Sequence, residues 1–114
     1  MAEFGTDIEE DLQLLDTKVK QCKLEYEKYF LGTRKREPLQ LRGEVQRYVQ
    51  YYAQARIKNT GFRFKFNNLR SRFFTFRRHW DETIRKIESG TYERHLFKAN
   101  IRDRERNEMA ERRQ

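Results

Sequence analysis

The chain contains few of the residues that break helices or cross-link folds. Its 114 residues include one proline, five glycines and a single cysteine, Cys22. One cysteine excludes an internal disulfide, and the scarcity of proline and glycine favours long helices. No apolar run approaches the roughly 18–20 residues of a membrane-spanning helix, and the first residues lack the basic and then apolar pattern of a signal segment. We therefore expect an all-α protein in the cytoplasm, without a transmembrane segment.

Apolar residues are also scarce relative to charged ones. Hydrophobic residues make up 36% of the chain and charged residues 39%, compared with averages of about 45–50% and 25%. A compact globule needs more apolar area than this, whereas an elongated helix needs only an apolar stripe. A chain of this length forms one domain at most.

Apolar residues recur at alternating steps of four and three in three stretches. This repeat places them on one narrow seam of a helix, and helices with such seams pack side by side. The pattern predicts an elongated antiparallel three-helix bundle or coiled-coil hairpin. The three seams are Ile8, Leu12, Leu15, Val19, Cys22, Tyr26 and Tyr29; then Leu41, Val45, Tyr48, Tyr52 and Ala55; then Phe62, Phe66, Leu69, Phe73, Phe76, Trp80, Ile84 and Ile87.

Capping signals predict where these helices begin and end. Thr6 with Glu9 is typical of a capping box, and Gly32 favours a left-handed stop. Pro38 is favourable in a first helical turn, and Asn59-Thr60-Gly61 is typical of a tight turn. The predicted helices are about 6–31, 38–58 and 62–89, with a short C-terminal helix at 91–101. Together they form a domain at 1–101, followed by a charged tail at 102–114 that is a frayed helix end or disordered.

Positive charge is concentrated in the middle of the chain. The formal net charge is +8, yet residues 1–31 hold eight acids and four lysines and so carry −4. Residues 33–86 hold 15 basic residues and four acids, and arginine outnumbers lysine there. Arginine makes forked contacts to phosphates and carboxylates. The imbalance indicates a nucleic acid, an anionic membrane or an acidic protein surface as partner, although part of it serves solubility.

Residues that carry out chemistry are few and scattered. The two histidines, His79 and His95, lie 16 residues apart, and the acids near them fit no metal-ligand spacing. The only serines are Ser71 and Ser89, and no glycine-rich loop follows a predicted strand. We expect neither an enzyme nor a cofactor or metal site.

The segment 62–80 combines six basic residues with no acid. Because its aromatics fall on the seam, we interpret them as core rather than as platforms that stack nucleic-acid bases. Arg63, Arg70 and Arg77 repeat every seven residues along one flank of the seam, about 10 Å apart on a helix. Phe74 lies beside them, and an aromatic next to arginines is a common hot-spot pattern at protein interfaces.

Six large apolar residues fall off the seams. They favour a core wider than a strict seam, and the alternative is a docking face for another protein or a second copy of the chain. These residues are Leu14, Leu24, Tyr51, Ile57, Phe64 and Phe74.

Taken together, these patterns predict a non-catalytic adaptor or regulatory subunit that binds an acidic or mixed-charge protein. The alternative is an RNA- or DNA-binding protein that uses the same arginine and aromatic face. Peripheral binding to an anionic membrane comes third, and a homo-oligomer stays open. The predicted partner-binding residues are Arg63, Arg70, Phe74 and Arg77, with Arg34, Lys35 and Arg36 on the basic link between the first two helices.

Overall fold

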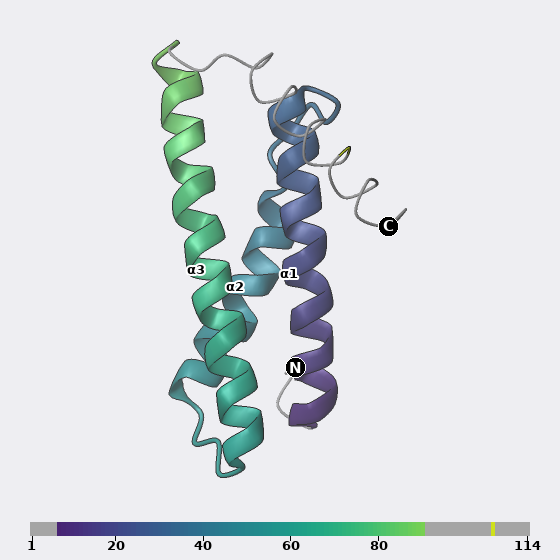
Figure 1. The fold of residues 1–114 in the computed structure, drawn as a ribbon, viewed down its shortest axis with the longest axis vertical. Coiled ribbons are helices and arrows are strands. Elements are labelled where there is room, and N and C mark those ends of the chain that lie inside the picture. The colour runs from purple at the N-terminus through teal and green to yellow at the C-terminus, as the bar shows by residue number, and fades with distance from the viewer. Residues whose placement is uncertain (1–6, 91–105, 107–114) are drawn as a thin grey trace.

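The computed structural model describes residues 7–90 and 106, and it consists of three packed α-helices. Helix α1 spans Ile8–Leu31, α2 spans Leu39–Gln54 and α3 spans Thr60–Glu88. In Figure 1, α1 and α3 run in the same direction, and α2, which lies between them in sequence, runs in the opposite direction. The described residues form no strand, so the all-α prediction is confirmed.

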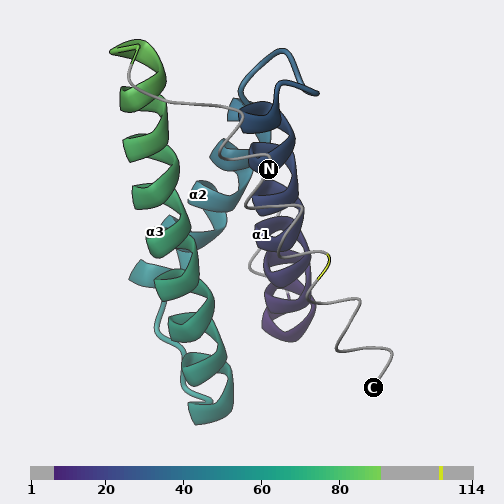
Figure 2. The same ribbon diagram turned by 45° about the horizontal axis from the view of Figure 1, so that its top comes forward.

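Helix α1 is the centre of the arrangement. It packs against both α2 and α3, whereas α2 and α3 contact each other less extensively. Figures 1 and 2 show α2 passing behind the other two helices at an inclination, from the end of α1 to the start of α3. Burial of the α1 stripe therefore holds the two outer helices in place.

The predicted seams form the core. On α1 every seam residue from Leu12 to Tyr26 is fully buried. The sequence missed Phe30 and Val49, which are buried although they lie one residue away from a seam position. The remaining core residues come from α2 and α3, and they are Val45, Tyr48, Tyr52, Phe66, Leu69, Phe73 and Trp80.

Capping side chains determine where α1 begins. Asp7 is its N-cap, and the carboxylate accepts hydrogen bonds from the backbone N–H groups of Glu9 and Glu10 at 3.1 and 3.3 Å. The predicted cap at residue 6 is therefore wrong, because Asp7 already satisfies the N–H groups of the first turn. The predicted stop at Gly32 is confirmed, since this glycine has a left-handed φ of 85°.

Helix α3 begins two residues earlier than the sequence predicted. Asn59 caps it by accepting a hydrogen bond from the N–H of Phe62 at 2.9 Å. Thr60 and Gly61 therefore lie in the first helical turn rather than in a tight turn. The helix ends at Glu88, one residue before the predicted end.

Helix α2 is shorter than predicted, at 39–54 instead of 38–58. Pro38 is its N-cap rather than part of the first turn, and Ala55 after its end has an extended backbone. The extended residues carry the chain to the cap of α3 and place Ile57 against the core. A helix that continued to residue 58 would consume the residues that this connection needs.

The prediction of a core wider than the seams is wrong for five of the six residues that suggested it. Leu14, Leu24, Tyr51, Phe64 and Phe74 are 38–68% exposed, and only Ile57 packs partly against the core. These side chains lie on the sides of their helices that face away from the packed stripe, where no other described helix covers them. The predicted helix at 91–101 and the tail at 102–114 lie outside the described residues, apart from Arg106.

We expect Phe73→Ala to lower the free energy of unfolding by about 3–5 kcal/mol, because it empties a fully buried site. The ring of Phe73 is 0% exposed. Phe64→Ala is the matched control on the same helix, since its ring is 68% exposed, and it should change stability by less than about 0.5 kcal/mol. Urea unfolding followed by circular dichroism measures both, and equal losses would contradict the assigned core.

Gly43 lies inside α2, so replacing it should stabilise the fold, in contrast to Phe73→Ala. A methyl group there would lie 3.7 Å from Nη1 of Arg47, which is an ordinary contact distance. We expect Gly43→Ala to raise the free energy of unfolding by about 0.5–1 kcal/mol by removing backbone freedom from the unfolded chain. A loss of stability in the same urea assay would mean that α2 lies closer to a neighbour than described.

Candidate functional site

Three of the predicted site residues form a line along α3. We call Arg63, Arg70 and Arg77 the α3 arginine row. Arg63 is exposed, whereas Arg70 and Arg77 are half-buried. Phe74 lies beside the row and is 38% exposed. Helix geometry separates successive members of the row by about 10 Å along the axis.

Aromatic rings hold two arginines of this row in place. The guanidinium carbon of Arg77 lies 4.6 Å from the ring centroid of Phe74 and 5.7 Å from that of Phe73. The guanidinium of Arg70 lies 5.5 Å from the ring centroid of Phe66. Such cation–π contacts contribute about 0.5–1 kcal/mol at exposed sites. A guanidinium group that stacks on a ring can still donate hydrogen bonds from its edge.

The positive charge of the row is not neutralised within residues 7–90. No ion pair joins Arg63, Arg70 or Arg77 to a carboxylate of the described chain. On the opposite flank of α3, by contrast, Arg72 lies 3.9 Å from a carboxylate oxygen of Asp16 on α1. The sequence explains this asymmetry, because residues 45–80 contain nine basic residues and no acid.

A hollow between α2 and α3 lies next to the row. Its volume is about 150 Å³. Two of its lining residues, Ala53 and Ala55, are small, and Arg63 and Arg70 line it from α3. We call this feature the α2–α3 hollow, and its remaining lining residues are Tyr52, Ile57, Phe66 and Asn67.

A partly buried polar network joins all three helices near the Arg77 end of the row. We call Tyr26, Glu37, Arg42 and Asp81 the polar lock. The Tyr26 hydroxyl donates a hydrogen bond to Glu37 at 2.6 Å and accepts one from Arg42 at 3.2 Å. Arg42 also makes a forked contact to the Asp81 carboxylate at 2.9 and 3.2 Å. The Tyr26 ring stacks on Trp80 at a centroid distance of 4.1 Å.

Burial and pairing shift the acid–base properties of the lock. Burial raises the pKa of Tyr26 well above its usual range, so the hydroxyl stays protonated. Burial alone would lower the pKa of Arg42, but hydrogen bonds to Asp81 and Tyr26 outweigh it and raise that pKa. Asp81 lies four residues beyond Arg77, close enough on a helix to neutralise it. Arg42 binds this carboxylate, and Arg77 makes no ion pair with a carboxylate of residues 7–90.

The basic link is ordered but separate from the row. Arg34 pairs with Glu25 at 2.9 Å, and its Nε donates a hydrogen bond to the carbonyl of Arg36 at 2.8 Å. The hydrogen bond from Lys28 and the contact with Arg34 lower the pKa of Glu25. Lys35 and Arg36 are exposed. Among the described residues, no hydrogen bond or ion pair connects this link to the α3 arginine row.

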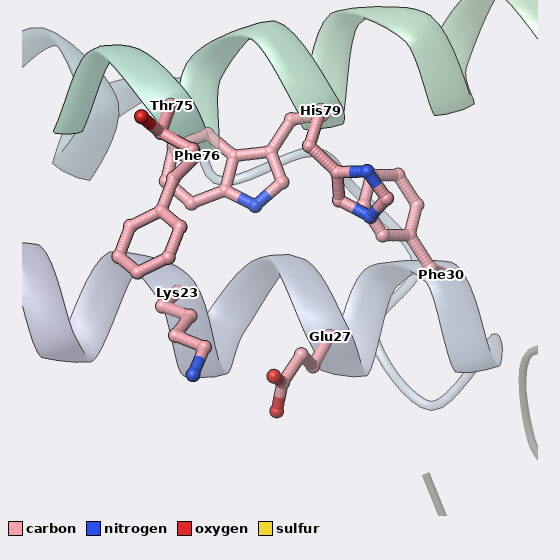
Figure 3. A pocket seen from close by; sticks show the side chains of 7 residues that line it. Lys23, Glu27, Phe30, Thr75, Phe76 and His79 are labelled. Carbon is pink, nitrogen blue, oxygen red and sulfur yellow. The ribbon is translucent and has the colours of Figure 1, made fainter. Parts of the chain in front are cut away.

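A second groove lies between α1 and α3, and the sequence did not predict it. Figure 3 shows Thr75, Phe76 and His79 of α3 lining it opposite Lys23 and Glu27 of α1. Its volume is about 370 Å³, and its floor is aromatic. The Lys23 ammonium lies 5.4 Å from the ring centroid of Phe76. None of the predicted site residues lines this groove.

The cysteine and the described histidine, which are the residues most able to act as nucleophile, base or metal ligand, do not form a cluster. Cys22 is buried in the core, and burial raises the pKa of its thiol to about 12. His79 is exposed, as expected for a surface histidine. Within the described ranges there is no cluster of three metal-ligating side chains, and none of the three helices is long and apolar enough to span a bilayer.

Comparison with protein-family models, with curated proteins and with solved structures gave no match. Arguments about function therefore rest on the geometry of this chain. Sequence analysis missed the polar lock as well as the groove between α1 and α3. Arg42 and Asp81 are 39 residues apart and belong to no seam, so no local pattern links them.

We expect Arg42→Met to lower the free energy of unfolding by about 1–3 kcal/mol, because it removes the hydrogen-bond donor to Tyr26 and Asp81. The Arg42 side chain is 14% exposed. Arg47→Met provides the control, since Arg47 lies on the same helix and is exposed. Urea unfolding compares the two variants, and indistinguishable midpoints would show that the lock contributes nothing to stability.

Proposed function

We propose that the protein is a non-catalytic adaptor or regulatory subunit that binds an acidic or mixed-charge protein through α3. This proposal rests on the charge of the α3 arginine row, which pairs with no carboxylate among residues 7–90 and lies beside a partly exposed Phe74. Aromatic and arginine side chains are the commonest hot-spot residues of protein interfaces. The row lies on a helix packed into the core, and two of its three arginines, Arg70 and Arg77, already contact aromatic rings.

Stacking reduces the entropic cost of binding at this surface. A free arginine side chain loses rotamer freedom when a partner immobilises it, at a cost of about 0.5–1.5 kcal/mol. Arg70 and Arg77 already contact aromatic rings in the folded protein. Part of their rotamer freedom is therefore lost on folding and not on binding. Forked hydrogen bonds from guanidinium to carboxylate then add geometric specificity.

Nucleic-acid binding through the same face is the second candidate. The run of nine basic residues without an acid at 45–80 favours it. However, single-stranded sites need exposed rings on which bases stack, and the seam rings Phe66, Phe73 and Trp80 are buried. Two exposed rings, Phe64 and Phe74, remain on α3 for stacking. Because so few rings are accessible, we favour a protein partner over a nucleic acid.

The proposal includes finer features that the sequence predicted. These are an elongated, antiparallel bundle of coiled-coil type with a short C-terminal helix, and a cytoplasmic location. An elongated bundle suits an adaptor, because a long helix presents a linear binding surface. Small-angle scattering of the full chain tests the shape directly, and a spherical profile would contradict it.

We expect Arg70→Glu with Arg77→Glu to abolish partner capture from a native lysate while helix content stays unchanged. The matched control is Lys65→Glu with Arg72→Glu, which has the same spacing and the same charge change on the opposite flank of α3. Its pair with Asp16 is long and exposed, so its loss costs little stability. Quantitative mass spectrometry of the captured proteins provides the measurement.

Nuclease treatment and salt separate the two candidate functions. Capture of a protein partner should survive nuclease and moderate salt, because apolar contacts around Phe74 contribute to binding. Binding to single-stranded nucleic acid should instead weaken linearly with the logarithm of salt concentration, with a slope of about −0.7 for each phosphate contacted. Capture that disappears with nuclease, or equal losses in both double variants, would overturn the adaptor proposal.

A further inference from the structure

We propose that the binding segment of the partner is an acidic amphipathic α-helix that lies along the α3 arginine row. In this arrangement its carboxylates, spaced seven residues apart, meet Arg63, Arg70 and Arg77. An apolar side chain between them packs against Phe74 and into the α2–α3 hollow. This inference rests on the proposed adaptor function and specifies the chemistry of its partner.

The spacing of the row selects a helix as the complementary element. Successive arginines lie about 10 Å apart, and carboxylates at seven-residue intervals on a neighbouring helix have the same spacing. The row also drifts slowly around α3, and a partner that crosses at about 20° follows this drift. A β-strand presents same-face side chains about 6.7 Å or 13 Å apart, so it matches fewer of the three positions.

The shape of the surface beside the row also suits a helix. The α2–α3 hollow has small residues, Ala53 and Ala55, on its α2 side. Small side chains let a helix approach closely, and helix-in-groove recognition uses apolar side chains at intervals of three and four residues as anchors. The exposed edge of Phe74 provides an apolar contact at the level between Arg70 and Arg77.

The positive charge of the arginine row indicates that the partner segment is acidic. The arginine row pairs with no carboxylate within the part of the chain that the structure describes. Asp81, which lies one helical turn from Arg77, is held by Arg42. An incoming carboxylate therefore displaces no internal ion pair, and it gains charge-assisted hydrogen bonds.

Synthetic helical peptides test this inference with the full chain. The first probe is a capped peptide of about three heptads with glutamates every seven residues, one leucine between each pair, and alanine and glutamine elsewhere. The second has the same composition, but its glutamates are five residues apart and so point to different sides. Fluorescence anisotropy should show that the first peptide binds roughly tenfold more tightly, which corresponds to about 1.4 kcal/mol.

A charge swap adds a test of which residues are in contact. The double variant Arg70→Glu with Arg77→Glu should no longer bind the glutamate peptide. It should instead bind a version of the peptide that carries arginine at the same positions. The Lys65→Glu and Arg72→Glu control should keep the original preference. Circular dichroism checks that each variant is folded, and Arg70→Gln with Arg77→Gln replaces the charge reversal if that variant unfolds.

The outcomes separate this inference from the adaptor proposal. Equal binding of the two peptides would overturn the helical register, while capture that depends on the row in a lysate would still support an adaptor. Failure of both peptides together with tight binding of a single-stranded oligonucleotide would overturn both. A preference for the spaced peptide that persists in the charge-reversed variant would place the binding helix elsewhere.

Discussion

The stacking of Tyr26 on Trp80 joins α1 to α3, and the rest of the bundle is arranged around this contact. The Tyr26 hydroxyl is held by Glu37 from the connection after α1 and by Arg42 from α2. One tyrosine thus supplies an apolar ring to the core and a hydroxyl to a polar network, a combination that tyrosine allows when its oxygen has a partner. Because each partner comes from a different part of the chain, the network fixes the relative positions of all three helices.

The same network sets the charge of the candidate binding surface. Arg42 binds the Asp81 carboxylate, which lies one helical turn from Arg77. Two acids of α1 are likewise engaged, because Asp16 pairs with Lys20 and Glu25 pairs with Lys28. Internal pairing of the acids therefore leaves an excess of positive charge along one edge of α3. Arg42 therefore has two effects, since it joins α2 to α3 and also engages the Asp81 carboxylate near the candidate binding surface.

The sequence predicted the helices and their buried faces because period alone determines which side of a helix is apolar. The alternation of four and three steps was enough to place Phe73 and Trp80 in the core. It could not predict that Asp7 and Asn59 would act as caps, since several neighbouring residues were equally suitable acceptors. The polar lock was beyond prediction for a different reason. Which charged side chains meet across helices depends on crossing angle and rotation, and neither is encoded in the hydrophobic period.

The central position of α1 has a consequence for how the chain folds. The two helices that are farthest apart in sequence, α1 and α3, share the larger contact surface. Neighbours in sequence can dock early, but the Tyr26–Trp80 contact forms only after the whole of α2 and both connections have been enclosed in a loop. Closing that loop costs entropy before any packing compensates for it, and folding slows as contacts become less local. We therefore expect this chain to fold more slowly than a helical protein whose contacts are all between neighbouring helices. The reason is that the Tyr26–Trp80 contact joins residues far apart in sequence.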